Sequence, residues 1–557
     1  MDKRMITVRL ILLSLFLATG CKTVILTPPP AKNILMFDEH GRPLDPTGDC
    51  GPLPCHVDYG IESTSFRNFE PAEWDQHIDD VLDSALAQKP TITENDPEPK
   101  RRILIFIHGG LNTDTSTVNR AYQNTASISA THFPIFVNWS SSLPSSYRDH
   151  LLYLSQGRFH RSRYLLAAPF KLASDLFRSL LRIPENMINA TSDRLATSPR
   201  SPRDVQIARL LGEPDMNCLQ EPQSAIRQEI QDEASFDDGF SVSFGCDCRL
   251  PEQHSMTSVA DALSWGLNTL RNYIGTPVVD LGGTNTWHTL LRRTAVLYHP
   301  EPVRRGGKAV GGGLGDFLQE LLTRIEDGEA ADWEITIVGH SMGAIVLNEM
   351  LRHVQEFYQQ PDYEKRTPPV RNIVYMAAAC SLRDYHDTVV PYLSRNPSAR
   401  MYHLTLHPIS DLSEQSQRIA PMGSLLVWID RFLSNPTSAQ DWTAGRFNNL
   451  TFTLRGDETP RHIRDRIHVR VFRAGFQYAE TDPQKHGDFT CMPFWRPSFW
   501  IGTAPACEMS LADARLKVGS LRGKTPCESA REALIEELEA KRGAAQQNSE
   551  KRRARKF

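Results

Sequence analysis

The sequence predicts an α/β fold with a mostly parallel sheet flanked by helices. Short apolar runs, of the kind that a parallel sheet buries on both faces, occur at 103–107, 133–139, 333–338, 372–377, 401–406 and 467–472. A helical pattern follows the third run, with apolar residues at three- and four-residue spacing: Leu347, Met350, Leu351, Val354, Phe357 and Tyr358. Strands that alternate with helices along a chain form right-handed βαβ units.

The composition limits the class of protein. The chain has 557 residues, of which 40% are hydrophobic, so it can bury a sizeable core and is too long for one ordinary domain. Its formal net charge is −4, which gives no global field that would attract nucleic acid. We therefore expect no nucleic-acid partner, and the sequence indicates no particular protein partner.

The N-terminus carries an export signal. Basic residues at positions 3 and 4 precede an apolar run at 10–17, and small residues then lead to Cys21. This pattern predicts a secretory signal peptide over 1–20, whose apolar run is too short to span a bilayer. The small residues before Cys21 resemble a bacterial lipobox, which implies cleavage there and lipidation of Cys21. Lys22 then favours the outer membrane of a bacterial cell envelope, facing the periplasm or the surface. The alternative is an ordinary signal peptide followed by a chance cysteine.

The other cysteines are expected to be exposed to an oxidising compartment, where some of them pair. The nearest plausible pairs are Cys50 with Cys55 and Cys491 with Cys507, and Cys380 is expected to stay free. One further cluster is a weaker candidate for a metal site, because its spacing fits no common zinc pattern: Cys218, Cys246, Cys248 and His254. We predict neither a metal nor a cofactor.

The chain divides into five predicted parts by pattern and composition. After the signal peptide, 21–98 is predicted to form a lipid-anchored tether and an irregular N-terminal segment. The α/β domain is predicted to comprise 99–140 and 331–507. Between them, 141–330 reads as a large, mainly helical insertion, or cap, and 508–557 as a C-terminal helix and basic tail.

An amphipathic helix near 169–183 is the best-defined part of the predicted cap. Its apolar residues fall on one face and its charged residues on the other. We expect a cap helix that packs its apolar face on the main domain. The alternative is a face that contacts a membrane or a lipid substrate.

The pentapeptide 339–343, Gly-His-Ser-Met-Gly, lies between a predicted strand and a predicted helix. A strand, a G-x-S-x-G turn and a helix form a nucleophile elbow, which presents the serine, here Ser341, to a substrate carbonyl. The turn is so tight that a side chain at Gly339 or Gly343 would collide with neighbouring backbone. A serine hydroxyl is a poor nucleophile, so it needs a base and a group that orients the base.

The candidate base is His486, in the loop after the strand at 467–472, where Gly487 would let the chain bend sharply. His462 precedes that strand and His468 lies within it, so both are weaker candidates.

The candidate acid is Asp411, which directly follows the strand at 401–406; Asp384 and Asp430 remain alternatives. His340, beside the serine, is expected to be structural.

An oxyanion needs preorganised N–H donors. One donor is expected from the backbone of Met342, the residue after the serine. The other is expected from Gly110 or Leu111, in the loop after the strand at 103–107, where Gly109 also allows close approach. His108 is expected to brace this loop.

Three segments together, 105–112, 137–141 and 337–343, resemble the α/β-hydrolase superfamily. The resemblance is closest to a bacterial, uncharacterised branch of lipase-like or esterase-like lipoproteins, although Ser140 stands where that branch has proline. It implies an α/β-hydrolase fold with the acid and the histidine following the serine in that order. It also implies hydrolysis of a small-molecule or lipid carboxylic ester through an acyl-enzyme on Ser341, without a cofactor. An acyltransferase with the same triad, or a binding protein on a hydrolase scaffold, are the alternatives.

Overall fold

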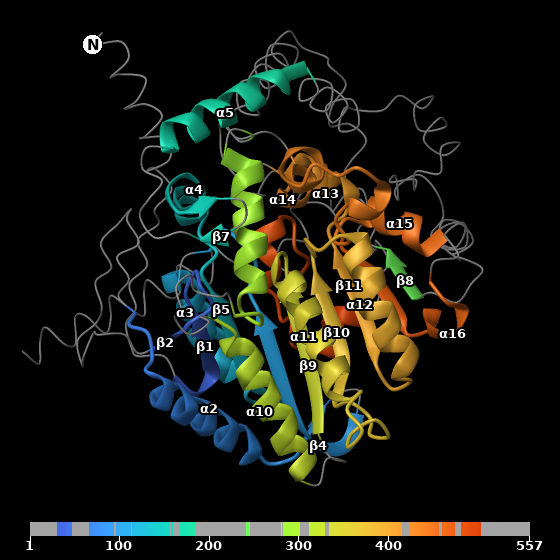
Figure 1. Cartoon of the computed structure of the whole chain (residues 1–557). Coiled ribbons are helices and arrows are strands. Elements are labelled where there is room, and N and C mark those ends of the chain that lie inside the picture. Colours follow the sequence, from blue (N-terminus) through green and yellow to red (C-terminus); the bar gives the residue numbers. More distant parts are fainter. Residues whose placement is uncertain are drawn as a thin grey trace, which may run out of the picture.

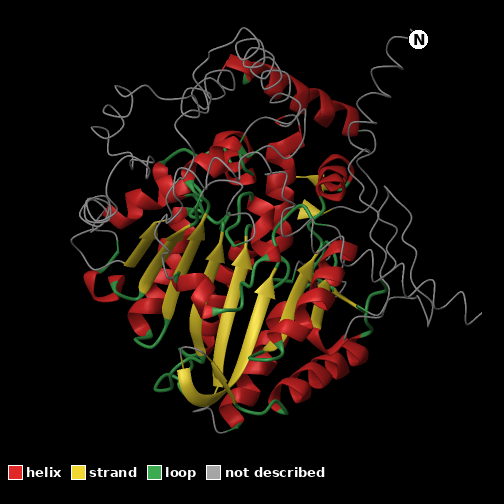
Figure 2. Ribbon diagram, turned by 180° about the vertical axis from the view of Figure 1, so that it is seen from behind, coloured by secondary structure: helices red, strands yellow, loops and turns green. Residues whose placement is uncertain are grey.

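A mostly parallel β-sheet runs through the centre of the protein (Figure 1). The computed structural model describes residues 31–46, 66–93, 96–112, 114–155, 158–159, 167–184, 241–244, 280, 282–300, 311–328, 333–414, 423–455, 459–473 and 481–502. Within these ranges the main sheet has ten strands, in the order β2-β1-β5-β4-β9-β10-β11-β12-β8, with β3 pairing to β4. Figure 2 shows the same sheet from behind as one continuous twisted layer.

The described strands of this sheet are β1 (Ile34–Phe37), β2 (Pro43–Leu44), β3 (Thr91–Thr93), β4 (Asp96–Ile107), β5 (Phe133–Trp139), β8 (Ser241–Phe244), β9 (Trp333–His340), β10 (Val370–Met376), β11 (Arg400–Thr405) and β12 (Ile467–Val471). Every neighbouring pair from β1 to β8 along the sheet is parallel, while β2 and β3 pair antiparallel at the margins. A separate short hairpin joins β6 (Leu154–Ser155) to β7 (Arg158–Phe159). The predicted α/β class and mostly parallel sheet are confirmed.

Helices flank the sheet. They are α2 (Pro71–Leu86), α3 (Asp114–Ile128), α4 (Leu143–Leu152), α5 (Ala168–Leu181), α10 (Gly313–Asp327), α11 (Gly343–Phe357), α12 (Leu382–Arg395), α13 (Pro408–Ser413), α14 (Leu425–Trp428), α15 (Phe447–Arg455), α16 (Arg461–Arg464) and α17 (Pro497–Ile501). Figure 1 shows α10, α11 and α12 side by side across one face of the sheet. Within the described ranges, no helix has both the length and the apolar character that a membrane crossing requires.

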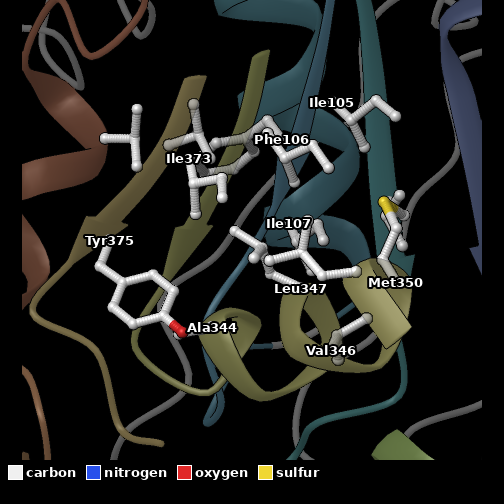
Figure 3. Packing of buried hydrophobic residues seen from close by; sticks show 14 of the residues in the cluster. Ile105, Phe106, Ile107, Ala344, Val346, Leu347, Met350, Ile373 and Tyr375 are labelled. Carbon is white, nitrogen blue, oxygen red and sulfur yellow. The ribbon is translucent and has the colours of Figure 1, made fainter. Parts of the chain in front are cut away.

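The core forms where α11 packs on the central strands. Figure 3 shows Leu347 and Met350 of α11 beside Ile105 and Ile107 of β4 and Ile373 of β10. None of these five side chains is measurably exposed. Burying one such side chain contributes about 1.5–3 kcal/mol, so this contact holds the N-terminal half of α11, which follows the elbow, against the sheet.

The α/β domain includes strands and helices from two segments that we expected to lie outside it. Strand β1 pairs with β5 and helix α2 buries Trp74 and Val81, although both elements lie within the expected tether at 21–98. Strand β8 pairs with β12 and helix α10 buries Phe317, although both lie within the expected cap at 141–330. Strands of four residues or fewer carry almost no periodicity, so the sequence pattern could not reveal β1 and β8. The expected C-terminal helix and tail at 508–557 lie outside the described residues.

Candidate active site

Ser341 lies at the turn between β9 and α11, where the predicted elbow is formed. Its φ is 53°, in the left-handed region that residues other than glycine rarely adopt. Its N–H donates to the Met376 carbonyl at 2.9 Å, and its carbonyl accepts from the Ala379 N–H at 2.9 Å. These bonds tie the turn to the end of β10. Backbone strain of this kind persists only where the surroundings impose it, and it is concentrated at functional sites.

Both glycines of the pentapeptide are required by close packing, as predicted. A Cβ on Gly339 would lie 2.9 Å from the Ala344 Cα, and a Cβ on Gly343 would lie 2.2 Å from the Ile107 carbonyl oxygen. Neither glycine has a positive φ among the described backbone angles, so the reason is space rather than conformation.

The loop after β4 lies directly against the elbow. A Cβ on Gly109 would come within 2.7 Å of the Ser341 Cβ, and one on Gly110 within 2.7 Å of the Met342 sulfur. His108 is held between two backbone groups: its Nδ1 donates to the Gly109 carbonyl at 2.6 Å, and its Nε2 accepts from the Trp139 N–H at 3.0 Å. Burial lowers the pKa of His108 to about 3, so the ring is neutral and braces the loop.

Of the two loop amides considered as oxyanion donors, one is already engaged. The Leu111 N–H donates to the Ser141 carbonyl at 2.9 Å. The Asn112 side chain meanwhile donates to the Gly109 and Gly110 carbonyls, at 2.8 and 3.2 Å, and fixes the loop from its far end. The geometry therefore favours Gly110 over Leu111 as the partner of the Met342 amide.

His486 is brought beside the elbow from the far end of the chain. It begins a 3₁₀ helix, His486–Cys491, and its ring centroid lies 5.1 Å from that of His340, the residue before Ser341. Two bonds hold its backbone: the His340 Nε2 donates to its carbonyl at 2.9 Å, and its N–H donates to the Glu414 carboxylate at 2.8 Å. His340 therefore positions the candidate base.

The environment keeps the His486 imidazole neutral. Burial lowers its pKa to about 4, and the charge of Asp411 opposes that shift. A neutral ring is the form that can accept a proton. Neither ring nitrogen of His486 has a hydrogen-bond partner in the described structure, and the Ser341 Oγ has none either. The structure thus brings the two residues to the same edge without a hydrogen bond between them.

Asp411 is the candidate acid whose charge acts on His486. It follows β11 on the short helix α13, and it is buried. One carboxylate oxygen accepts from the Ser424 hydroxyl, and the other from the Arg446 Nε at 2.7 Å. No bond joins Asp411 to the His486 ring in the described structure.

The two alternative acids are engaged elsewhere. Asp430 accepts from Arg446 at 2.8 Å and from Asn449 at 2.7 Å. Asp384 accepts from Asn348 of α11 at 2.6 Å and from Arg352. Asp411 is the acid whose charge raises the pKa of His486 against the effect of burial, so it remains the better placed of the three.

Two residues of this region were missed by the sequence analysis. Glu414 contacts the His486 backbone, and burial raises its pKa to about 8. Arg446 is buried between Asp411 and Asp430 and pairs with both. The position of Glu414, three residues after Asp411, is only a weak indication that it belongs to the site. No sequence pattern identifies Arg446, because its role depends on contacts with two aspartates that only folding brings close.

The remaining predicted residues are placed as follows. His462 is exposed on α16, and His468 on β12 stacks on Tyr402 with ring centroids 5.1 Å apart. The chain turns into the 3₁₀ helix at this point, but a Cβ on Gly487 would meet no atom within 4 Å and its φ is not positive, so the turn does not require a glycine there.

The cysteine predictions are resolved in part. Cys380 is free and buried, as predicted. Cys491 is disulfide-bonded, while its expected partner Cys507 lies outside the described residues, as do Cys50 and Cys55. The weak metal candidate also lies outside them: Cys218, Cys246, Cys248 and His254. Among the residues that the structure does describe, no group of His, Cys, Asp or Glu is arranged to hold a metal ion.

Comparison with protein-family models, with curated proteins and with solved structures finds no match to this chain. The inference of function therefore depends on the geometry of the site and on the resemblance of its motifs.

Proposed function

We propose that this chain is a serine hydrolase of the α/β-hydrolase superfamily that cleaves carboxylic esters through an acyl-enzyme on Ser341. The observation that carries the proposal is the elbow. Ser341 holds a left-handed φ of 53° directly under the glycine loop, and the clamped His486 lies beside its neighbour His340. Strand order supports it too, since the serine, the acid and the histidine follow three separate parallel strands, β9, β11 and β12.

In the proposed reaction, His486 takes the proton of the Ser341 hydroxyl as the Oγ attacks the ester carbonyl carbon. The oxyanion accepts hydrogen bonds from the Met342 and Gly110 amides, and losing one such donor typically costs about 10²–10³ in turnover. The imidazolium gives its proton to the departing alcohol, which leaves Ser341 acylated. His486 then deprotonates a water molecule that attacks the acyl group, and the acid leaves as the proton returns to Ser341. Asp411 stabilises the imidazolium through its charge.

Hydrogen bonds between catalytic groups are often long before substrate binds and tighten afterwards. The proposal therefore requires the His486 ring to turn toward Ser341 on one side and toward Asp411 on the other when substrate enters. The two hydrogen bonds that hold His486 involve its backbone and no atom of its side chain.

Burial of the nucleophile favours a second candidate, acyl transfer. Ser341 is only 1% exposed and His486 only 7% exposed. A site that excludes water can pass the acyl group to an alcohol acceptor instead of to water. The same residues would act, and only the group that resolves the acyl-enzyme would differ.

The site of action that we propose is the bacterial cell envelope. Lipidation of Cys21 would anchor the protein at a membrane, where its substrate is a lipid or small-molecule ester. The lipobox-like sequence around Cys21 supports this part of the proposal.

A fluorophosphonate probe tests the nucleophile. We expect the wild type and a Ser84→Ala control on α2 to be labelled, and Ser341→Ala to stay unlabelled with unchanged thermal unfolding. Absence of labelling in well-folded wild type, at probe concentrations that label a known serine hydrolase, would favour the binding-protein alternative. A panel of p-nitrophenyl esters of different chain length, with and without alcohol acceptors, then ranks hydrolysis against transfer.

A further inference from the structure

We propose that helix α5 docks this protein on the surface of a lipid bilayer through an exposed apolar face. The proposal does not depend on the chemistry at Ser341. It adds a second membrane contact to the proposed lipid anchor at Cys21, and its test measures vesicle binding rather than catalysis.

The apolar side chains of α5 point away from the protein. Six large ones are exposed by the following fractions: Phe170 78%, Phe177 64%, Leu181 64%, Leu180 51%, Leu176 50% and Leu172 44%. In the rest of the described chain, only Leu111 and Ile501 are large hydrophobic residues with comparable exposure. The expectation that α5 packs its apolar face on the main domain is therefore wrong.

The polar side of α5 is buried instead. Asp175 is 5% exposed, and its carboxylate accepts three hydrogen bonds from other helical segments. The donors are Asn285 Nδ2 at 2.6 Å, His150 Nε2 at 3.2 Å and the Tyr147 hydroxyl at 3.3 Å. A buried carboxylate needs such partners, so this network specifies which side of α5 faces inward.

Both ends of the helix are held in the same way. Near its start, the Lys171 ammonium donates to the His150 carbonyl at 2.9 Å. At its C-terminus, Arg182 pairs with the buried Asp280 at 3.0 Å and donates to the Arg431 carbonyl at 3.1 Å. A helix on a water-soluble surface ordinarily turns its apolar stripe inward. Here the polar contacts of Lys171, Asp175 and Arg182 hold the reverse orientation. The Nε and Nη2 atoms of Arg178 are also buried, and they have no hydrogen-bond partner in the described structure.

The chemistry of the exposed face fits a bilayer. The exposed positions of α5 carry no charged side chain; besides the six large residues they include Pro169, Ala173 and Ser174. An interfacial helix inserts such a face into the boundary between headgroups and acyl chains. The cations Lys171 and Arg182, which could otherwise mark a binding site for an acidic protein, are engaged with the body of the protein.

The length of chain before the folded part favours the bilayer over other partners. Ten residue steps separate Cys21 from Ala31, the first residue described, and they span at most about 35 Å when fully extended. An acylated Cys21 would therefore keep the folded body close to the membrane at all times. Figure 1 shows α5 beyond α13 and α14, on the side to which the sheet strands point. Docking through α5 would turn that edge, with the candidate active site, toward the lipid.

The experiment is flotation with vesicles of phosphatidylethanolamine and phosphatidylglycerol. It uses the mature chain, residues 21–557, carrying Cys21→Ser so that no acyl chain contributes. We expect this protein to float with the vesicles, also at high salt. The double substitution Phe170→Gln with Phe177→Gln should lower partitioning by about tenfold or more, because two large apolar contacts with the lipid are lost. The control Ile501→Gln, at an exposed apolar residue outside α5, should leave it unchanged.

Thermal unfolding and size-exclusion chromatography test whether something other than a bilayer covers the apolar face of α5, namely a further part of the chain or a second copy of the protein. If a further part of the chain covered α5, the double substitution would lower the unfolding temperature markedly, and this would overturn the proposal. If a second copy covered it, the protein without vesicles would be a dimer that the double substitution dissociates, with no flotation in either form. Failure of the starting protein to float would also overturn it, whatever the outcome of the probe experiment on Ser341.

Discussion

At the scale of single residues, the candidate site depends on one strained serine and one clamped histidine. Ser341 keeps a backbone conformation that costs about 1–3 kcal/mol, and its bonds to Met376 and Ala379 hold it there. His486 is fixed at both its N–H and its carbonyl, by Glu414 and His340. Neither nitrogen of its ring has a hydrogen-bond partner in the described structure.

Removal of the candidate base tests this arrangement. We expect His486→Ala to lower ester turnover by about 10²–10⁴-fold, the range that a general base contributes. Its thermal unfolding should match that of the wild type, so that the loss reflects catalysis and not folding. His462→Ala is the matched control, because that histidine is exposed on α16 and precedes the strand. The measurement is kcat/KM on a p-nitrophenyl ester. An equal loss in both variants would show that His486 is not the base.

The sequence identified Ser341 because the elbow is written in five consecutive residues. It identified His486 and Asp411 through their positions after two strands. It could not identify Glu414 or Arg446, because each is selected by contacts with residues brought together only by folding: Glu414 with the backbone of His486, and Arg446 with Asp411 and Asp430. A residue whose role is to satisfy a buried partner has no local pattern of its own.

At the scale of elements, the turn between β9 and α11 depends on two close backbone approaches. The helix starts so near the end of β4 that Gly343 leaves no space for a methyl group beside the Ile107 carbonyl. The sequence predicted this from the tightness of the turn alone. At Gly487 the same comparison gives a different result, because a Cβ there would meet no close atom and the φ angle is one that any residue can adopt.

The contrast between these glycines gives a second prediction. Gly343→Ala places a Cβ 2.2 Å from a carbonyl oxygen, so we expect a loss of about 1–3 kcal/mol or more in the free energy of unfolding, together with loss of probe labelling. Gly487→Ala should change that free energy by less than about 1 kcal/mol. Urea unfolding monitored by circular dichroism measures both. A tolerated alanine at Gly343 would contradict the close packing of the elbow on β4.

Element length decided which strands the sequence could predict. The runs that became β4, β5 and β9 to β12 have five or more residues and stood out as apolar segments. Strands β1 and β8 have four residues each and gave no signal, yet they extend the sheet at both margins. Helix α5 shows the converse: its position and amphipathic pattern were predicted, but the direction of its apolar face depended on partners from α4 and from residue 285.

At the scale of the whole molecule, buried neutral histidines make the fold sensitive to acid. Burial lowers the pKa of His108 and His403 to about 3 and of His132 and His486 to about 4. The unfolded chain binds these protons near pH 6.5, so between pH 6.5 and 4 the unfolded state carries more protons than the folded one. Above pH 6.5 these histidines are neutral in both states and leave the free energy of unfolding unchanged. As the pH falls through this window, protonation of the unfolded chain lowers that free energy.

The third prediction is a loss of stability as the pH falls through that window. One unit of pKa shift corresponds to about 1.4 kcal/mol, so each such histidine lowers the free energy of unfolding as the pH falls through this window. Glu414 has the opposite sign, because its raised pKa of about 8 favours the folded state at low pH, and burial raises the pKa of Asp384 and Asp430 in the same direction. The lowered pKa values of further histidines act with the four named above: His77, His288, His340 and His468. The free energy of unfolding should fall from pH 7 to pH 5 in urea titrations. His403→Gln should flatten this slope, and His462→Gln should not; a slope that His403→Gln leaves unchanged would exclude the buried histidines as its cause.

By itself, the sequence determined the α/β class, the strand–turn–helix at Ser341 and the helical stretch of α5, because each depends on the spacing of residues within one short segment. The tertiary structure alone decided how far the sheet extends, which groups hold the His486 backbone, which loop amide is already hydrogen-bonded and which side of α5 faces outward. These features are fixed by contacts between segments tens to hundreds of residues apart. Such contacts depend on which buried polar groups find partners once the chain has folded, and no local pattern records that outcome.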